Sequence, residues 1–253
     1  MTASGVVPHD LSAHAEIAAA RYAEQRPLFE DYASTVSKIL HDALRREGIH
    51  VSGIQYRAKD LDSFREKAAR PHPERLGRPR YLRPVEDIKD LAGVRVIVRF
   101  EEEIEAACAV VEREFRGAQR TKDDRRAHTK LCETFGYQSV HYVARMSSRR
   151  CRLPEYARFR HLQAEVQIRT VLHHAWAEIE HDLQYKAANV IDPALRRRFA
   201  CVAAVLELAG REFEAINLEY RRLHQVAAAE PVPVSEPTVP TVPKVEIPPP
   251  RSA

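Results

Sequence analysis

Apolar residues recur at spacings of three and four near the start of the chain, which is the period of an amphipathic helix. These residues are Leu28, Tyr32, Val36, Ile39 and Ala43. Pro27 stands directly before them, and proline is favoured at the first helical position because it has no N–H to satisfy there. The pattern predicts a scaffold helix in the first fifty residues, with Pro27 in its first turn.

Strand and helix patterns then alternate through the middle of the chain. The predicted elements are a strand at 51–57, a helix from about Asp60, a loop rich in proline and arginine at 70–84, a short helix at 87–91, a strand at 91–100, a helix at 101–116 and a polar loop at 117–133. In the second strand Val94, Val96, Val98 and Phe100 alternate with Arg95, Ile97 and Arg99, which is the pattern of a strand with one apolar face.

Two further strands are expected at 137–146 and 162–169, each with one apolar and one polar face. Helical spacing returns with Leu172, Trp176, Ile179 and Leu183, and again in a long helix from Pro193 that extends to Leu223. We expect both helices to pack on the sheet. From about residue 227 the sequence is dense in proline and lacks aromatics, which predicts a disordered tail.

The composition is that of a globular protein, with 44% hydrophobic and 30% charged residues in 253. This length fits one substantial α/β domain. No apolar run approaches the roughly 20 residues of a membrane helix, and the N-terminus has no signal-peptide pattern. We therefore expect a cytoplasmic protein with no membrane partner.

Basic residues are unevenly distributed, although the net charge is only +4. They gather in two segments, as Arg120, Lys122, Arg125, Arg126 and Lys130, and as Arg149, Arg150, Arg152, Arg158 and Arg160. Such clusters suit a polyphosphate or RNA partner. The alternative is an ordinary solvated surface.

A first candidate site combines four residues of the segment around the predicted helix at 60. Lys59, Ser63 and Lys67 are four residues apart and share one helical face, and Arg57 ends the preceding strand. Converging cations of this kind balance the charge of a polyphosphate. An ordinary charged helix face has the same pattern, but the chain has no GxxxxGK[ST] loop that would otherwise hold ATP.

A second candidate site is the acidic pair Asp90 and Glu165, which lies in segments that otherwise have the pattern of buried strands. A carboxylate in such a place needs a partner. Two carboxylates, together with phosphate oxygens of the substrate, are enough to bind Mg²⁺. The alternative is that each carboxylate forms a structural ion pair with Arg95 or Arg169. A third candidate site is the strand face with Tyr137, Ser139 and His141, where the aromatic ring of Tyr137 could stack on a nucleobase.

Four segments together resemble the synthetase domain of the RelA/SpoT family. They are RAKDLDSFREKA, DIKDLAGVRVIV, FGYQSVHYV, and AEVQIRT followed by HAWAEIEHDLQYK, and the resemblance covers roughly residues 30–220. It implies an α/β (α+β) fold of nucleotidyltransferase type, with a mixed sheet flanked by helices and a long C-terminal helix. The expected boundaries are a helical extension at 1–27, the synthetase domain at 28–226 and the tail at 227–253.

The resemblance also implies an activity, the transfer of pyrophosphate from ATP to the 3′-hydroxyl of GDP or GTP with release of AMP and with Mg²⁺ as cofactor. By motif position, Arg57, Lys59, Ser63 and Lys67 are expected to bind the ATP phosphates, and Asp90 and Glu165 to hold the metal and to be catalytic. Tyr137, His141, Arg95 and Gln167 are the expected acceptor-binding residues. Glu165 is also placed to assist deprotonation of the attacking hydroxyl.

The acceptor stays open at this stage, because the residues before Gly136 depart from those of many family members. The segments also resemble a toxin-type branch, some members of which use adenine nucleotides or pyrophosphorylate the 3′ end of tRNA. A non-catalytic nucleotide- or RNA-binding module is a further alternative, disfavoured by the presence of Asp90 and Glu165. An antitoxin protein and self-association are partners that the family resemblance suggests.

Overall fold

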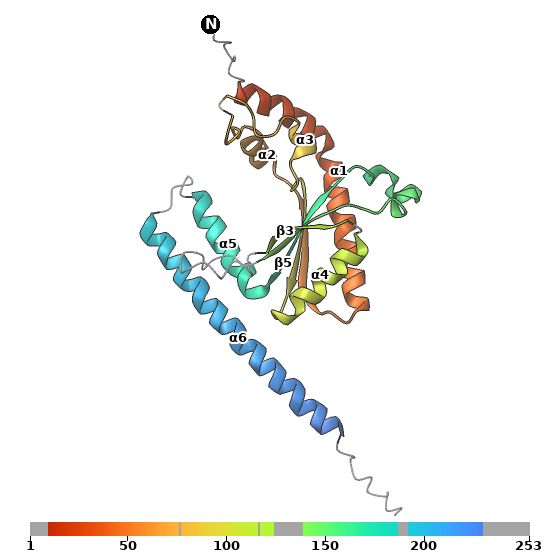
Figure 1. The fold of residues 1–253 in the computed structure, drawn as a ribbon, viewed down its shortest axis with the longest axis vertical. Helices are drawn as coiled ribbons and strands as arrows, with labels where there is room; N and C mark the ends of the chain where they lie inside the picture. The colour runs from red at the N-terminus through yellow and green to blue at the C-terminus, as the bar shows by residue number, and fades with distance from the viewer. Residues whose placement is uncertain (1–9, 76, 116, 124–138, 187–191, 230–253) are drawn as a thin grey trace, which may run out of the picture. The chain divides into compact units, whose positions relative to one another are not determined.

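A mixed five-stranded sheet forms the centre of the molecule, as a computed structural model shows for residues 10–75, 77–115, 117–123, 139–186 and 192–229 (Figure 1). The strands are β1 (Val51–Ala58), β2 (Ala92–Val98), β3 (Gln119–Asp123), β4 (Val140–Ala144) and β5 (Ala164–Thr170), in the order β1-β2-β5-β4-β3. Only β2 and β5 pair in parallel, and the other neighbours are antiparallel. The expected mixed sheet flanked by helices is confirmed.

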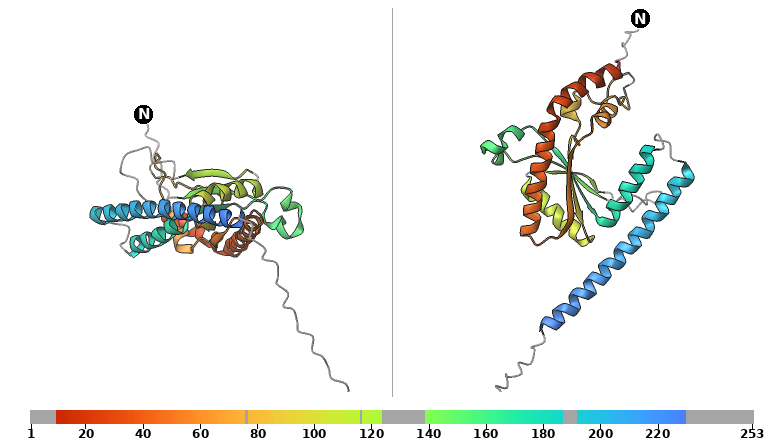
Figure 2. Two further views of the ribbon diagram at one scale, coloured as in Figure 1. Left: turned by 90° about the horizontal axis from the view of Figure 1, so that it is seen from below. Right: turned by 180° about the vertical axis from the view of Figure 1, so that it is seen from behind.

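Helices cover the two faces of this sheet unequally. They are α1 (Leu11–Arg46), α2 (Leu61–Ala68), α3 (Pro84–Asp87), α4 (Glu102–Glu114), the 3-10 helices η2 (Arg150–Arg152) and η3 (Pro154–Phe159), α5 (Val171–Lys186) and α6 (Pro193–Ala229). Opposite views place α1 and α4 on one side of the sheet and α5 on the other (Figures 1 and 2). The chain divides into two compact units, residues 1–215 and 216–253.

The core lies between the sheet and the α1–α4 layer. Val94, Val96 and Val98 of β2 are buried there, as are Val166 and Ile168 of β5. Ile104, Cys108 and Val111, which recur at helical spacing in α4, and Phe115 directly after this helix are all fully or almost fully buried. Because side chains alternate along a strand, the intervening residues of β2 and β5 emerge on the opposite face.

Helix α1 corrects the expected position of Pro27. The helix begins at Leu11, where the carboxylate of Asp10 accepts hydrogen bonds from the N–H groups of Ser12 and Ala13, and Pro27 lies in its interior. Proline in a helix removes one backbone hydrogen bond. The apolar stripe nevertheless continues on the N-terminal side of Pro27, where Tyr22 is completely buried, and this packing offsets the loss.

Two further expectations about local structure were wrong. The short helix is residues 84–87, not 87–91, because Pro84 occupies its first turn and residues 89 and 90 form a turn before β2. Part of the expected loop at 117–133 is strand β3, which pairs with β4 at the sheet edge. Its residues QRTKD are polar and lack apolar alternation, so no pattern distinguishes them from a loop.

Helices α5 and α6 lie where the pattern places them, although α6 continues to Ala229, three residues into the expected tail. Both helices pack on the sheet less than expected. Trp176 is buried, and its indole N–H donates to the carbonyl of Phe199 at 3.2 Å. In contrast, Ile179 is 58% exposed, Val202 51% and Phe213 53%. None of the helices within the described part of the chain is long and apolar enough to cross a membrane.

Candidate active site

Strand register aligns several of the expected site residues in two rows across the polar face of the sheet. In one row Arg57 pairs with Gly93, which pairs with Glu165. In the next row Gln55 pairs with Arg95, Arg95 with Gln167, and Gln167 with His141. Because residues two apart on a strand share a face, both rows face the same side. Residues separated by more than a hundred positions therefore meet on one surface.

Asp90 and two lysines form a compact ionic cluster beside the first row. Oδ2 of Asp90 accepts hydrogen bonds from Nζ of Lys59 at 3.0 Å and from Nζ of Lys67 at 2.9 Å. The backbone of Lys59 is fixed on both sides, since its N–H donates to Leu91 O at 2.9 Å and its carbonyl accepts from Tyr22 Oη at 2.8 Å. The two lysines that the helical spacing brings together thus converge on one carboxylate.

Local structure at the start of α2 explains this convergence. The carboxylate of Asp60 caps the helix by accepting from the N–H groups of Asp62 and Ser63, so the helix begins directly after Lys59. Two helical turns later Lys67 returns to the same side. Phe64 packs underneath, stacked on Tyr22 with ring centroids 4.4 Å apart.

The charges of this cluster keep Asp90 ionised. Burial opposes ionisation, but the positive charges and hydrogen bonds of Lys59 and Lys67 outweigh it and hold the pKa of Asp90 below its ordinary value. Its other oxygen, Oδ1, is buried and has no hydrogen-bond partner among the described residues. One carboxylate oxygen is thus satisfied and the other is available to a ligand.

Glu165 is held by neighbours on its own sheet face. Its Oε2 accepts from Nε2 of Gln167 at 2.7 Å, and its Oε1 lies 3.4 Å from Nδ1 of His141. Burial works against ionisation of this carboxyl, but His141 and Gln167 hold the pKa of Glu165 below its ordinary value. The other ring nitrogen of His141 lies 2.6 Å from the Ser139 hydroxyl, which orients the ring.

Two adjoining cavities lie over the rows. The first, about 390 Å³, is lined by residues of β1, β2, β5 and α5 that include Arg57, Asp90, Gly93, Arg95 and Glu165. The second, about 330 Å³, shares Arg57 and Arg95 with the first and adds residues of β4 and α5. The two acids and four of the expected basic and polar residues, Arg57, Arg95, Gln167 and His141, thus line one continuous hollow.

Three residues of this site were missed by the sequence reasoning. Nη1 of Arg95 donates to Gln55 at 3.0 Å and to Glu178 of α5 at 2.7 Å, and Arg169 donates to Gln167 at 3.1 Å. Gln55 lies two positions before Arg57 on β1, so side-chain alternation places both on one face, and Gln55 was accessible to prediction. The ion pair between Arg95 and Glu178 depends on the position of α5 in the fold, which the sequence pattern does not give.

The second cavity is lined by three arginines, Arg57, Arg95 and Arg169, and by two glutamates of α5, Glu178 and Glu180. Burial and the charges of Arg169 and Arg95 lower the pKa of His174, against the opposing effect of Glu178. A cationic field in a concave site attracts anionic groups such as phosphates. This cavity therefore suits the phosphate groups of a second substrate.

Ser63 lies away from both cavities, and Tyr137 is not among the described residues. Ser63 is exposed at the start of α2, bonds the Asp60 carboxylate and does not line either cavity. Its expected role with ATP stays a prediction. Tyr137 lies outside the described residues, so its expected role also stays a prediction.

Asp90 and Glu165 fit a divalent cation. Oδ1 of Asp90 is a buried carboxylate oxygen without a hydrogen-bond partner in the described part of the chain, and such hard oxygen donors are what Mg²⁺ prefers. No group of three or more metal-ligating side chains was found among the described residues. A cation held here would therefore complete its coordination with phosphate oxygens and water, as Mg²⁺ usually does.

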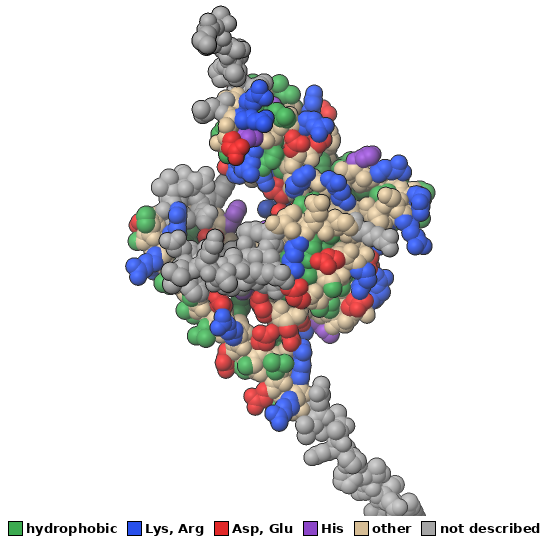
Figure 3. Space-filling view, in the orientation of Figure 1, with side chains coloured by type: hydrophobic (Ala, Val, Ile, Leu, Met, Phe, Trp, Pro, Cys, Tyr) green, Lys and Arg blue, Asp and Glu red, His purple; other side chains and the backbone are tan. Residues whose placement is uncertain are grey.

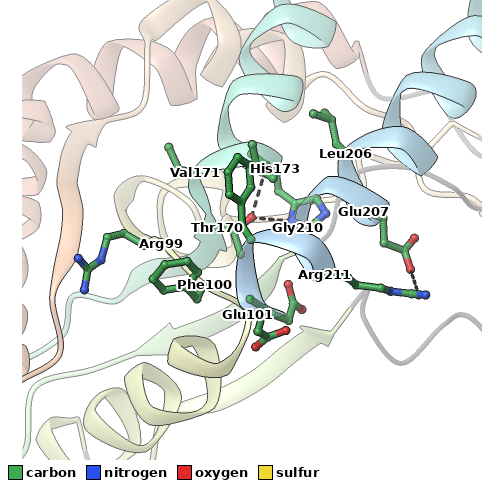
Figure 4. Close-up of a pocket in the computed structure, with 13 residues that line it drawn as sticks. Arg99, Phe100, Glu101, Thr170, Val171, His173, Leu206, Glu207, Gly210 and Arg211 are labelled. Carbon is green, nitrogen blue, oxygen red and sulfur yellow. Dashed lines mark hydrogen bonds and ion pairs between the residues drawn. The ribbon is translucent and has the colours of Figure 1, made fainter. Parts of the chain in front are cut away.

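A third cavity, about 450 Å³, is separate from this site (Figure 4). It is lined by the end of β2, the start of α5 and residues of α6, and it shares no residue with the two cavities above. The Thr170 hydroxyl lies 2.8 Å from Nδ1 of His173 and accepts from its backbone N–H at 3.3 Å. This contact fixes the first turn of α5, the helix that carries Glu178.

Comparisons with solved structures agree with this fold. The chain superposes on small alarmone synthetase 1 from Bacillus subtilis with a TM-score of 0.64 and 21% identity, over 80% of this chain and 98% of that one. The same protein bound to its product pppGpp gives a TM-score of 0.61 and 23% identity, over 78% and 98%. The fold is therefore that of the small alarmone synthetases.

Sequence comparisons go further. The chain matches the region found in RelA/SpoT proteins over residues 56–190. It is 30% identical over 163 residues to the GTP pyrophosphokinase YjbM of Bacillus subtilis (strain 168), which is 64% of this chain and 70% of that protein. It is 32% identical over 111 residues to YwaC of the same organism, which is 44% and 49%. The chain belongs to the RelA/SpoT family.

Proposed function

We propose that this protein transfers the β,γ-pyrophosphate of ATP to the ribose 3′-hydroxyl of a guanine nucleotide, GDP or GTP. The observation that carries the proposal is the hollow lined by two ionised carboxylates, Asp90 and Glu165, and by Arg57 and Arg95. Lys59 and Lys67 pair with Asp90 beside it. Similar proteins support this proposal. YjbM and YwaC are named GTP pyrophosphokinases, and solved structures with a similar fold contain pppGpp or AMPCPP.

Roles follow from where each side chain lies. Arg57, Lys59 and Lys67 lie on the Asp90 side of the hollow, where they balance the negative charge of the ATP phosphates. On the other side Arg95, Gln167 and His141 face the second cavity and bind the acceptor nucleotide. The donor and the acceptor thus lie over adjoining rows of one sheet, which aligns them for direct transfer.

Mg²⁺, bound between Asp90, Glu165 and the ATP phosphates, would supply Lewis-acid stabilisation of the charge that develops on the phosphates. The 3′-oxygen attacks the β-phosphorus, the bond from that phosphorus to the oxygen of the α-phosphate breaks, and AMP leaves. Glu165, which is ionised at neutral pH, accepts the hydroxyl proton. His141 and Gln167 hold the Glu165 carboxylate toward that proton.

A second candidate acceptor is the 3′ end of tRNA. The observation that favours it is the excess of arginine on the acceptor side, where Arg95, Arg169 and Arg57 line the second cavity, since RNA affinity depends strongly on phosphate contacts. Adenine nucleotides are a further alternative. The sequence departure before Gly136 bears on this choice of acceptor and not on the donor.

The test uses ATP labelled in the β- and γ-phosphates, with Mg²⁺, and offers GDP, GTP, ADP, ATP or deacylated tRNA as acceptor. We expect label on GDP or GTP and stoichiometric AMP, both lost in Asp90→Asn and in Glu165→Gln. Label on tRNA alone would identify the 3′ end of tRNA, and not a guanine nucleotide, as the acceptor. Nucleotide binding without any AMP release would overturn the enzymatic function.

A further inference from the structure

A strongly basic cavity lies on the connection between β4 and β5, apart from the candidate active site. It measures about 1090 Å³, and six arginines line it: Arg113, Arg145, Arg149, Arg150, Arg152 and Arg160. It shares no residue with either cavity of the active site. Figure 3 shows blue side chains gathered over the projecting segment that carries η2 and η3, at the right of the view.

Only part of this positive charge is balanced within the described part of the chain. Arg150 pairs with Glu114 at 2.8 Å, and Arg113 with Glu47 at 3.0 Å. No side-chain hydrogen bond or ion pair joins Arg149, Arg152 or Arg160 to another described residue. All three are exposed. The cavity therefore presents three guanidinium groups with no carboxylate partner there, where like charges repel one another.

The chemistry of the lining suits phosphate groups. Every basic residue of the lining is arginine, and the planar guanidinium matches a phosphate with two parallel hydrogen bonds. Ser147 and Ser148 add hydroxyl donors, and the one carboxylate of the lining, Glu114, is already engaged by Arg150. An anion with several phosphates would relieve the repulsion among the arginines.

The same lining favours a nucleic acid backbone over a free nucleotide. It contains no aromatic ring on which the base of a free nucleotide could stack. Its volume is also above the range of about 300–1,000 Å³ that is usual for small-molecule pockets. A site that grips phosphates without reading bases is typical of sequence-independent contact with a polynucleotide.

We propose that the arginine cavity between β4 and β5 binds the phosphate backbone of RNA. This binding does not depend on which nucleotide accepts the pyrophosphate, because the cavity is separate from the active site. The arginines recognise a row of phosphate groups, and a free polyphosphate contains such a row as well as RNA. The experiment therefore includes inorganic tripolyphosphate and pppGpp as competitors.

The test measures fluorescence anisotropy of a labelled single-stranded RNA with the full-length protein across a salt series. The variant is the triple Arg149→Ala, Arg152→Ala, Arg160→Ala. The matched control is Arg196→Ala, Arg197→Ala, Arg198→Ala, which removes three exposed arginines of α6 that line no cavity named here. Thermal melts and transfer to free nucleotides are followed in parallel and should match wild type in both.

We expect the cavity variant to lose about tenfold or more in RNA affinity, and its salt slope to fall by about 2, as the loss of three phosphate contacts to a single strand predicts. The control should keep wild-type affinity. An equal loss in both variants would reduce the binding to net charge and overturn the proposal. So would unchanged affinity in the cavity variant. Tighter binding of tripolyphosphate or pppGpp than of RNA, measured as competition constants with the wild-type protein, would make a free polyphosphate the ligand and overturn the proposal as well.

Discussion

The amide of Gln167 donates a hydrogen bond of 2.7 Å to Oε2 of Glu165, two positions earlier on the same face of β5. The carbonyl oxygen of that amide accepts from the buried Arg169 at 3.1 Å, so the amide can donate only in one orientation. Arg169, Gln167 and Glu165 thus form a chain of hydrogen bonds along one face of β5, and this chain fixes the orientation of the Glu165 carboxylate. This makes Gln167 a positioning residue for Glu165 as well as an expected acceptor contact.

Replacing Gln167 by alanine should therefore act through Glu165. The hydrogen bond from Gln167 contributes to lowering the pKa of Glu165, so its loss raises that pKa. The acidic limb of the pH dependence of kcat/KM, below which Glu165 is protonated, should move to higher pH, and kcat should fall about tenfold or more. A uniform loss at every pH, with the limb unmoved, would mean that Gln167 has only a structural role.

The ionic cluster at Asp90 should make stability depend on pH in a specific window. Since the folded-state pKa of Asp90 is lowered, its ionisation stabilises the fold above the unfolded-state pKa of about 3.9, and this contribution disappears as pH falls through the folded-state value. Asp90→Asn should lose about 2 kcal/mol at neutral pH, because two lysines are left without their anion.

Urea unfolding of the wild type and of Asp90→Asn between pH 3 and 7 measures this difference in the free energy of unfolding. The contributions of the other carboxylates are the same in both proteins and therefore cancel in the difference. The difference between the two free energies of unfolding should be largest near neutral pH and should narrow as the pH falls below about 4. Asp62→Asn is a suitable control, because Asp62 is an exposed acid on the same helix. A gap that stays constant over the whole range would contradict the assignment of the charge effect to Asp90.

Gly93 leaves the floor of the first cavity open, between Arg57 and Glu165 in the same row. A Cβ at Gly93 would meet only Arg57 O at 3.8 Å and Arg57 Cγ at 3.9 Å, which is ordinary contact. A β-branched side chain also suits a strand. Gly93→Val should fold with a melting temperature near that of wild type and yet obstruct the site.

Initial-rate kinetics should show the KM for ATP of Gly93→Val raised about tenfold or more, a transition-state loss of about 1.4 kcal/mol. Gly53→Val serves as the matched change, since Gly53 of β1 has open space at its Cβ position and lines neither cavity of the site. Wild-type KM in Gly93→Val would place the ATP phosphates elsewhere.

The faces of β2, β4 and β5 were predictable because strand geometry forces side chains to alternate, so Glu165 and His141 could be named from sequence. Asp90 lies in the turn before β2, and it was named as an acid at the entrance of a buried strand. The convergence of Lys59 and Lys67 followed from helical spacing for the same kind of reason. Strand β3 was not predictable, because an edge strand of polar residues is held by backbone hydrogen bonds that leave no side-chain pattern. Helical periodicity likewise gave α5 an apolar stripe without revealing that Ile179 on it stays exposed.

The pairing of Arg95 with Glu178 lies furthest from any sequence pattern, because it joins residues 83 positions apart through the placement of α5. Glu178 engages the guanidinium that we assign to the acceptor, so it competes with the acceptor phosphates for Arg95. Glu178→Gln should accordingly lower the KM for the acceptor, and Arg95→Ala should raise it. Both changes should be a few-fold, because Glu178 is 56% exposed and solvent screens the pair.

Steady-state kinetics with varied GDP or GTP at saturating ATP checks this pair of opposite shifts, which a general disturbance of the fold would not produce. The shifts should shrink at high salt, where screening weakens the competing ion pair. Arg99→Ala is the control, because Arg99 follows β2, pairs with Glu103 at 3.4 Å and lines neither cavity of the active site. If both Arg95→Ala and Glu178→Gln raise the KM, Glu178 supports the acceptor site and does not compete with it.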